Sequence, residues 1–256
     1  MNTEEFVSYR KKLVDACSKV IVGKHDEITL VAVCYLCGGH ILLEDVPGTG
    51  KTMLCRAFAK ATGGSFRRIQ FTPDLMPSDV TGINYYNTKK GEFEFRPGPI
   101  FANMVLADEI NRATPRTQSS LLEAMAERQV SIDGLTRKLD EPFMVAATQN
   151  PIESYGTFPL PEAQMDRFMM RMSLGYMTRS EEIGVALRTD SAELLDSIDV
   201  VVSVEETEAL RRLLSDIEIS EPVMGYLMDI IEATRQDQRI NIGASPRGTI
   251  ALCKAA

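Results

Sequence analysis

The sequence predicts an α/β protein in which a mostly parallel sheet is covered by helices on both faces and is followed by a smaller all-helical part. Apolar, strand-like runs alternate with helical segments as far as residue 168, which is typical of a parallel sheet. From about residue 178 the apolar residues recur only at spacings of three and four, as in helices. We therefore expect an α/β core over residues 1–175 and a helical lid over residues 176–256.

Four segments open the predicted core. Residues 4–20 carry apolar side chains at helical spacing, so we expect an amphipathic helix there. A second helix is expected over residues 27–37, because two glycines follow it. Residues 40–44 are an apolar strand, and a third helix is expected over residues 53–62, where two more glycines end it.

The turn between that strand and the third helix combines two glycines with a lysine and a threonine. Gly48 and Gly50 allow backbone N–H groups to turn toward a phosphate. Lys51 adds a positive charge, and the Thr52 hydroxyl can bind Mg²⁺. Asp45 stands where the pattern G-x-x-x-x-G-K-[ST] has its first glycine, at the end farthest from the phosphates. An ordinary turn would explain the glycines alone. The predicted nucleotide contacts are Pro47, Gly48, Thr49, Gly50, Lys51, Thr52 and Met53.

Two later strand-like runs also end in polar residues. Asp108 and Glu109 follow one run, and Asn150 follows the other. Phosphoryl transfer needs a carboxylate that holds the metal ion and a group that orients the attacking water. We assign the metal to Asp108 and the water to Glu109, and we expect Asn150 to orient the water or the terminal phosphate. Since the carboxyl ends of parallel strands meet, these residues should lie near Lys51.

Two pairs of short alternating segments predict hairpins. Residues 83–86 and 92–95 form the first pair, and residues 129–132 and 136–139 form the second, around Asp133.

Charge and composition exclude several classes of protein. The net charge of −8 argues against direct binding of nucleic acid, which would show as clustered lysine and arginine. We interpret the pairs Arg67-Arg68 and Lys89-Lys90 as solvated charges. The first residues are polar and no apolar run has the length of a membrane span, so we expect neither a leader nor membrane insertion.

The five cysteines form no repeating framework. Cys34 and Cys37 have the C-x-x-C spacing, but they lie in an apolar stretch and no second Cys or His pair completes a zinc site. Buried free thiols are expected instead. A reducing, cytoplasmic location follows as the default.

Together these segments resemble the AAA+ ATPases and, among them, the MoxR-like family. The resemblance covers nearly the whole chain from residue 20, and its motifs occur in the family's order. The similar segments are residues 43–52 (phosphate loop), 71–82 (after the second strand), 108–113 (Walker B), 147–151 (sensor 1), 160–168 (arginine-finger helix) and 243–247 (sensor 2 turn). It implies a P-loop NTPase fold that binds ATP with Mg²⁺ and hydrolyses the nucleotide.

The resemblance also assigns residues outside the strand ends. Ile21, Val22 and Gly23 would lie against the adenine base, although they could equally be a plain helix stop. Arg247, after Pro246 at a predicted helix start, would bring a cation from the lid to the β- and γ-phosphates.

Arg167 would act in trans, on the nucleotide of the neighbouring subunit. The alternative is a salt bridge to Asp166 or Glu162. Arg112 and Arg116 are weaker candidates for the same surface between subunits.

For the assembled protein, the resemblance implies a homo-oligomer, a hexamer, that acts on a protein client or on an adaptor with a von Willebrand factor A domain. The first hairpin would face the centre of the ring or the client, unless it is a simple edge hairpin. Relatives usually continue through further lid helices, so we expect an incomplete lid here. The implied activity is chaperone-like remodelling or maturation of the client.

Two other classes of function stay open. An ATP-gated assembly module would bind ATP and hydrolyse it negligibly. A phosphotransferase of the P-loop kinase type would move the phosphate to a small acceptor, but such an enzyme must exclude water, whereas Asp108, Glu109 and Asn150 suit a site that positions water.

Overall fold

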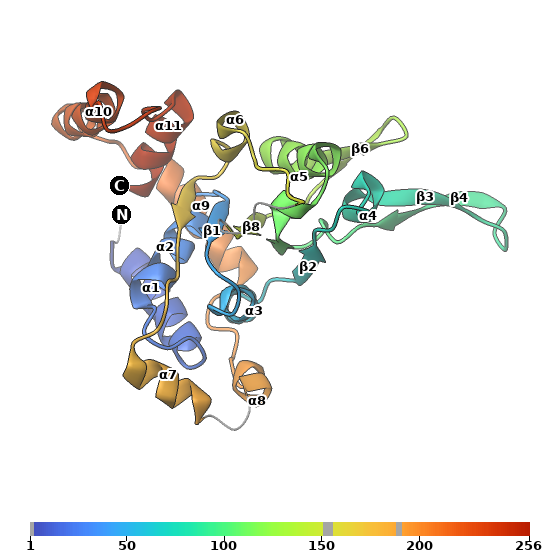
Figure 1. The fold of residues 1–256 in the computed structure, drawn as a ribbon, viewed down its shortest axis with the longest axis horizontal. Helices are drawn as coiled ribbons and strands as arrows, with labels where there is room; N and C mark the ends of the chain where they lie inside the picture. Colours follow the sequence, from blue (N-terminus) through green and yellow to red (C-terminus); the bar gives the residue numbers. More distant parts are fainter. Residues whose placement is uncertain (1–2, 151–155, 188–190) are drawn as a thin grey trace.

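A computed structural model describes residues 3–150, 156–187 and 191–256. Its centre is a parallel five-stranded sheet of order β2-β5-β8-β1-β9, of which Figure 1 labels β2, β8 and β1. In chain order the strands are β1 Ile41–Glu44, β2 Phe66–Gln70, β5 Met104–Asp108, β8 Met144–Gln149 and β9 Met170–Met172. The parallel sheet predicted from the alternation of segments is confirmed.

Each central strand sends alternate side chains into one of two hydrophobic cores, as the two-residue period of a strand requires. On β8, Met144 and Ala146 lie in one core, while Val145 and Ala147 lie in the other. The first core is closed by α1 Thr3–Ser18, α2 His25–Leu36 and α3 Lys51–Ala61. The second is closed by α5 Pro115–Glu127. The sheet is therefore covered on both faces, as predicted.

Parallel pairing brings the carboxyl ends of the strands to one edge of the sheet. Gln70 on β2 pairs with Asp108 on β5, and Glu44 on β1 pairs with Gln149 on β8. The loops that follow these strands are therefore neighbours.

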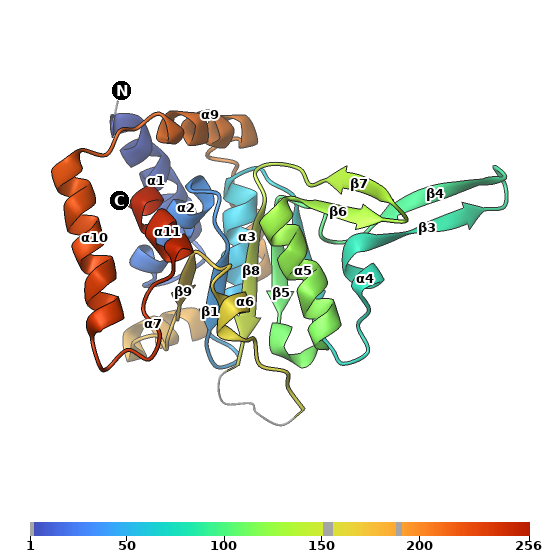
Figure 2. The same ribbon diagram turned by 90° about the horizontal axis from the view of Figure 1, so that it is seen from above.

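Both predicted hairpins form and project from the same end of the body (Figure 2). They are β3 Gly82–Asn87 with β4 Glu92–Pro97, after the short helix α4 Pro77–Thr81, and β6 Gln129–Ile132 with β7 Leu135–Lys138. Asn84 Nδ2 donates to Asp133 Oδ2 at 2.8 Å, and the Arg137 guanidinium lies 3.9 Å from the centroid of the Phe95 ring. These contacts join the two hairpins.

After residue 178 the described chain contains only helices. They are α7 Arg179–Ala186, α8 Ser191–Asp196, α9 Val204–Ser215, α10 Glu221–Gln236 and α11 Pro246–Ala255. Leu195 and Leu210, from α8 and α9, belong to the first core of the body, whereas α10 and α11 pack mainly on one another at the end opposite the hairpins (Figure 2). The domain boundary at residues 175–176 stays a prediction.

Candidate functional site

The turn after β1 has the backbone that a phosphate loop needs. Gly48 and Gly50 have φ of 89° and 91°, a left-handed conformation that glycine adopts without strain. A Cβ at either position would meet nothing within 4 Å, so glycine is needed for its backbone freedom and not for space. Helix α3 begins directly after the loop at Lys51, and its N-terminal N–H groups favour an anion.

This loop lines a cavity of about 440 Å³ at the carboxyl edge of the sheet. All the predicted contacts from Pro47 to Met53 line the cavity, together with Asp108, Glu109 and Asn150. The structure thus brings the predicted strand-end residues to the predicted phosphate loop. Pro151, the last residue of the sensor 1 segment, lies outside the described residues.

Lys51 folds back over its own loop. Its Nζ donates to the backbone oxygens of Asp45 at 2.8 Å and Val46 at 3.1 Å. Partial burial lowers the pKa of Lys51, and the negative charges of Asp45, Asp108 and Glu109 oppose that shift. The ammonium group lies where it can exchange these carbonyl partners for phosphate oxygens.

Asp45 takes the place of the first glycine because its carboxylate has a structural task. The side chain is buried and accepts hydrogen bonds from Ser173 Oγ at 2.8 Å, from the Gly175 N–H at 3.2 Å and from the Leu174 N–H. Three donors thus tie the start of the phosphate loop to the segment that follows β9.

Asp108, at the end of β5, is held by two partners. Oδ1 accepts a hydrogen bond from Thr148 Oγ1 at 2.7 Å. Oδ2 accepts from Arg68 Nη2 at 2.6 Å and Arg68 Nε at 3.0 Å. The interpretation of Arg68 as a merely solvated charge is wrong, because its guanidinium pairs with Asp108 and lines the cavity.

Glu109 is fixed through both its backbone and its side chain. It has φ 56° and ψ 50°, and its N–H donates to Thr148 Oγ1 at 2.8 Å. Its Oε2 accepts from Gln70 Nε2 at 2.9 Å and from Arg112 Nη1 at 3.1 Å. Arg112, predicted for the surface between subunits, is thus an ion-pair partner of Glu109.

The donor set suits Mg²⁺. The Thr52 hydroxyl and the Asp108 carboxylate both line the cavity, and oxygen ligands of this kind are those that Mg²⁺ prefers. In the described part of the chain, no three His, Cys, Asp or Glu residues gather as a metal site.

Sequence reasoning missed the polar residues that support this site. Gln70 and Arg68 lie on one face of β2, since they are two residues apart in a strand, and Thr148 precedes the end of β8. A signal was available: Arg68 and Gln70 stand two residues apart directly before residues 71–82, the segment that the resemblance places after the second strand.

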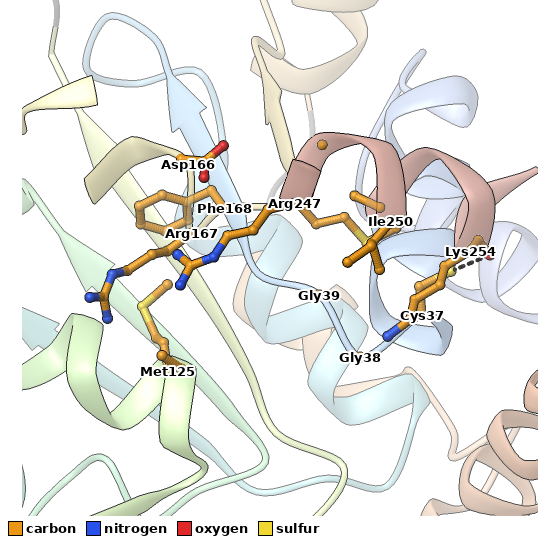
Figure 3. A pocket seen from close by; sticks show the side chains of 14 residues that line it. Cys37, Gly38, Gly39, Met125, Asp166, Arg167, Phe168, Arg247, Ile250 and Lys254 are labelled. Atoms are coloured by element: carbon orange, nitrogen blue, oxygen red, sulfur yellow. Dashed lines mark hydrogen bonds between the residues drawn. The ribbon is translucent and has the colours of Figure 1, made fainter. Parts of the chain in front are cut away.

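A second cavity, of about 290 Å³, lies between the body and α11, and both remaining arginines line it (Figure 3). Arg167 Nη1 donates to the Leu122 backbone oxygen at 2.8 Å, and its buried Nε has no hydrogen-bond partner within the described chain. Asp166 Oδ1 instead accepts a hydrogen bond from Ser245 Oγ. Neither Arg167 nor Arg247 lines the cavity at the phosphate loop.

The turn at residues 21–23 lies against the lid. Ile21 is buried, and Gly23 has φ 71° with the Glu181 carboxylate directly above it, 1.9 Å from where a Cβ would stand. These residues do not line the cavity at the phosphate loop, so contact with the adenine base stays a prediction.

The cysteines are free thiols throughout the described chain. Cys17, Cys34 and Cys55 are buried, and burial raises the pKa of each thiol to about 12. Cys37 is only half-buried and donates to the Lys254 backbone oxygen at 3.1 Å (Figure 3). None of the helices between residues 3 and 256 that are described combines the length and apolarity of a membrane span.

The chain matches the family model of the ATPase family associated with various cellular activities (AAA) over residues 40–170. It is 50% identical to YeaC of Bacillus subtilis, covering 96% of this chain and 77% of that protein. Identity to the chaperone MoxR1 of Mycobacterium tuberculosis is 39%, over 93% of this chain and 65% of MoxR1. Protein MoxR of Methylorubrum extorquens is 30% identical over 93% of this chain and 76% of its own length.

A crystal structure from Cytophaga hutchinsonii, assigned as an ATPase, superposes with a TM-score of 0.88 at 42% identity, over 98% of this chain and 80% of that one. Its fold and these sequence matches agree with the cavity in which the phosphate loop meets Asp108 and Glu109. The chain belongs to the MoxR-like family of AAA ATPases.

Proposed function

We propose that this protein hydrolyses ATP with Mg²⁺ in a cytoplasmic homo-oligomeric ring, a hexamer, and uses the hydrolysis to remodel or mature a protein client. The observation that carries the proposal is the single cavity lined by Lys51, Thr52, Asp108, Glu109 and Asn150. That set supplies a phosphate-binding cation, oxygen ligands for a metal and a base for water, which is the protein chemistry that phosphoryl transfer needs.

Each residue has a task that its position supports. Backbone N–H groups of the loop and the Lys51 ammonium bind the phosphates, while Thr52 and Asp108 would hold Mg²⁺, which supplies charge neutralisation at the phosphate oxygens. Glu109, with its backbone fixed by Thr148, orients the attacking water and accepts its proton. Asn150 orients the same water or the terminal phosphate.

The two arginines support the proposed ring. Arg167 and Arg247 line a cavity away from the phosphate loop of their own chain, so we assign both to the nucleotide of a neighbouring subunit. A guanidinium supplied in trans stabilises the charge of the transition state. For Arg247, this assignment names the β- and γ-phosphates of the neighbouring subunit in place of those of its own chain.

The proposed client and adaptor are inferred from the relatives of this chain. One relative is named as a chaperone, which supports action on a protein, either directly or through an adaptor with a von Willebrand factor A domain. We expect no direct contact with nucleic acid.

The test is free phosphate released per protomer with Mg·ATP over a range of protein concentrations. A ring with arginines in trans gives a rate per protomer that rises with concentration and then levels, because the site is complete only after assembly. No phosphate release by a protein that binds ATP would reject hydrolysis.

One observation favours the alternative, an ATP-gated assembly module with negligible hydrolysis. Both catalytic carboxylates are paired with cations, Asp108 with Arg68 and Glu109 with Arg112. A permanently paired Glu109 could not act as a base. Tight ATP binding, assembly on ATP addition and no free phosphate would together support this alternative.

A further inference from the structure

Arg68 lies on the metal-binding carboxylate of the proposed ATPase site. It extends from β2, which is the edge strand of the sheet and the neighbour of β5. Its Nη2 and Nε lie 2.6 and 3.0 Å from Asp108 Oδ2, and Nη2 also donates to Gln70 Oε1 at 2.6 Å. The side chain is about half exposed, at 48%, and it lines the cavity of the phosphate loop.

The two oxygens of Asp108 have different surroundings. Oδ1 is held by the Thr148 hydroxyl at 2.7 Å, and the same hydroxyl accepts the Glu109 N–H at 2.8 Å. Thr148 therefore cannot turn away without releasing Glu109. Oδ2 is the oxygen that faces a replaceable partner, and that partner is Arg68.

A magnesium ion that binds through Asp108 thus meets a guanidinium already in place. Two cations at one carboxylate repel each other, and the repulsion is weakly screened in a partly enclosed site. Arg68 must leave Oδ2 as the metal arrives. Its other partner, Gln70, also lines the cavity, so a guanidinium that leaves Asp108 has a second anchor in the cavity that would receive the triphosphate.

We propose that Arg68 is a displaceable counter-ion of Asp108, which Mg²⁺ replaces when nucleotide binds, and that the released guanidinium then binds the terminal phosphate of ATP. A guanidinium suits both partners, since its planar donors match carboxylate and phosphate oxygens equally well. The proposal rests on the proposed function, and it adds a residue that couples the arrival of the metal to recognition of the third phosphate.

The first test measures ADP binding while Mg²⁺ is titrated, with Arg68→Gln and a matched control, Arg67→Gln. Arg67 is the neighbouring arginine on the opposite face of β2. Loss of the competing cation should lower the half-saturating Mg²⁺ concentration at least threefold. Without metal the same variant should bind ADP more weakly, because Asp108 then repels the phosphates. Arg67→Gln should change neither value, and an unchanged Mg²⁺ requirement in Arg68→Gln overturns displacement.

The second test compares the affinity for a β,γ-imido analogue of ATP with that for ADP at saturating Mg²⁺. In Arg68→Gln the ratio of the affinity for the analogue to the affinity for ADP should fall at least fivefold. In Arg68→Lys, which keeps the charge, the ratio should fall less. An unchanged preference overturns the contact with the terminal phosphate.

The two proposals fail in distinguishable ways. If the unaltered protein binds neither nucleotide, the ATPase proposal falls and this one with it. If it binds Mg·ADP but Arg68→Gln behaves identically in both tests, only the role of Arg68 is rejected. Melting of each nucleotide-free variant shows whether it is folded. If Arg68→Gln does not fold, Arg68→Met, which also removes the charge, takes its place in both tests.

Discussion

Glu109 shows how one residue can be held in an unfavourable conformation for a purpose. Its φ of 56° lies in the left-handed region, which side chains with a Cβ seldom adopt. Such strain persists only where neighbours fix the residue, and it concentrates at functional sites. Here the Thr148 hydroxyl fixes the backbone, and Gln70 and Arg112 fix the carboxylate.

Substituting Glu109 with Gln should separate binding from hydrolysis. The amide keeps the shape of the side chain and its link to Gln70 but cannot accept the proton of water, so we expect ATP to stay bound while phosphate release falls by about 10²-fold or more. Binding is measured with a fluorescent ATP and turnover by free phosphate. Glu127→Gln, at an exposed position at the end of α5, is the control that should leave both unchanged.

His40 should make the stability of the protein depend on pH. Its ring is buried: Nδ1 accepts the Val145 N–H at 2.9 Å and Nε2 lies 3.1 Å from the Met125 oxygen. Burial, aided by the nearby Arg128, lowers its pKa from 6.5 to about 3. Between these values the unfolded chain binds a proton that the folded chain does not, so the free energy of unfolding should fall by about 1.4 kcal/mol for each pH unit below 6.5.

Urea unfolding between pH 7.5 and 4.5 measures this slope. His40→Gln should have a lower free energy of unfolding at pH 7.5. The dependence of that free energy on pH should be weaker by the contribution of one proton, about 1.4 kcal/mol per pH unit. His25→Gln removes the chain's other histidine, which is exposed on α2, and should keep the full slope. Equal slopes in all three proteins would mean that other groups set the pH dependence.

At the scale of elements, Asp45 joins two segments that are far apart in the sequence. Its carboxylate links the phosphate loop after β1 to the chain after β9 through Ser173, Leu174 and Gly175. That chain leads into α7, so the loop and the lid share an anchor. Hydrogen bonds to a buried charged group are among the stronger ones in proteins.

Substituting Asp45 with Asn should weaken this anchor. The amide has one acceptor oxygen in place of two and no charge, so we expect the free energy of unfolding to drop by about 2 kcal/mol. Denaturant unfolding measures the change, with Asp15→Asn on the exposed face of α1 as the control. A drop no larger than that of the control would show that Asp45 contributes no more than a surface charge.

The sequence predicted these elements well where the signal is local. The strands that lead to the phosphate loop, to Asp108 and to Asn150, the helix after that loop and both hairpins were predictable from periodicity and glycine positions, and the strand-end residues from their place in that pattern. The role of Arg68 could not be predicted, because its partner Asp108 is 40 residues away and the pairing depends on the register of β2 against β5. The position of Arg247 depends in the same way on how α11 packs.

At the scale of the whole molecule, the proposed division of one active site between two subunits predicts complementation. Arg167→Ala should bind ATP but turn over about 10³-fold more slowly, because its partner lacks the cation in trans. Lys51→Ala should not bind ATP, yet it still offers Arg167 to a neighbour. Mixing the two inactive proteins should therefore restore phosphate release.

The control for this mixture is Arg10→Ala, which alters an exposed arginine on α1 and should stay active alone. If the mixture remains as inactive as its components while subunit exchange is demonstrated, Arg167 does not act in trans. Restored turnover would place the complete site between subunits.

The buried contact between Tyr9 of α1 and Thr207 of α9, at 2.9 Å, has a consequence for how the protein is made. Tyr9 packs in the same core as Leu210 of α9, and α1 is translated long before α9. The nucleotide-binding body cannot finish its core while only its own strands have been synthesised. The part of α1 around Tyr9 therefore stays without its partner on α9 until a residue 198 positions later has been translated, a period in which holdase chaperones can bind it.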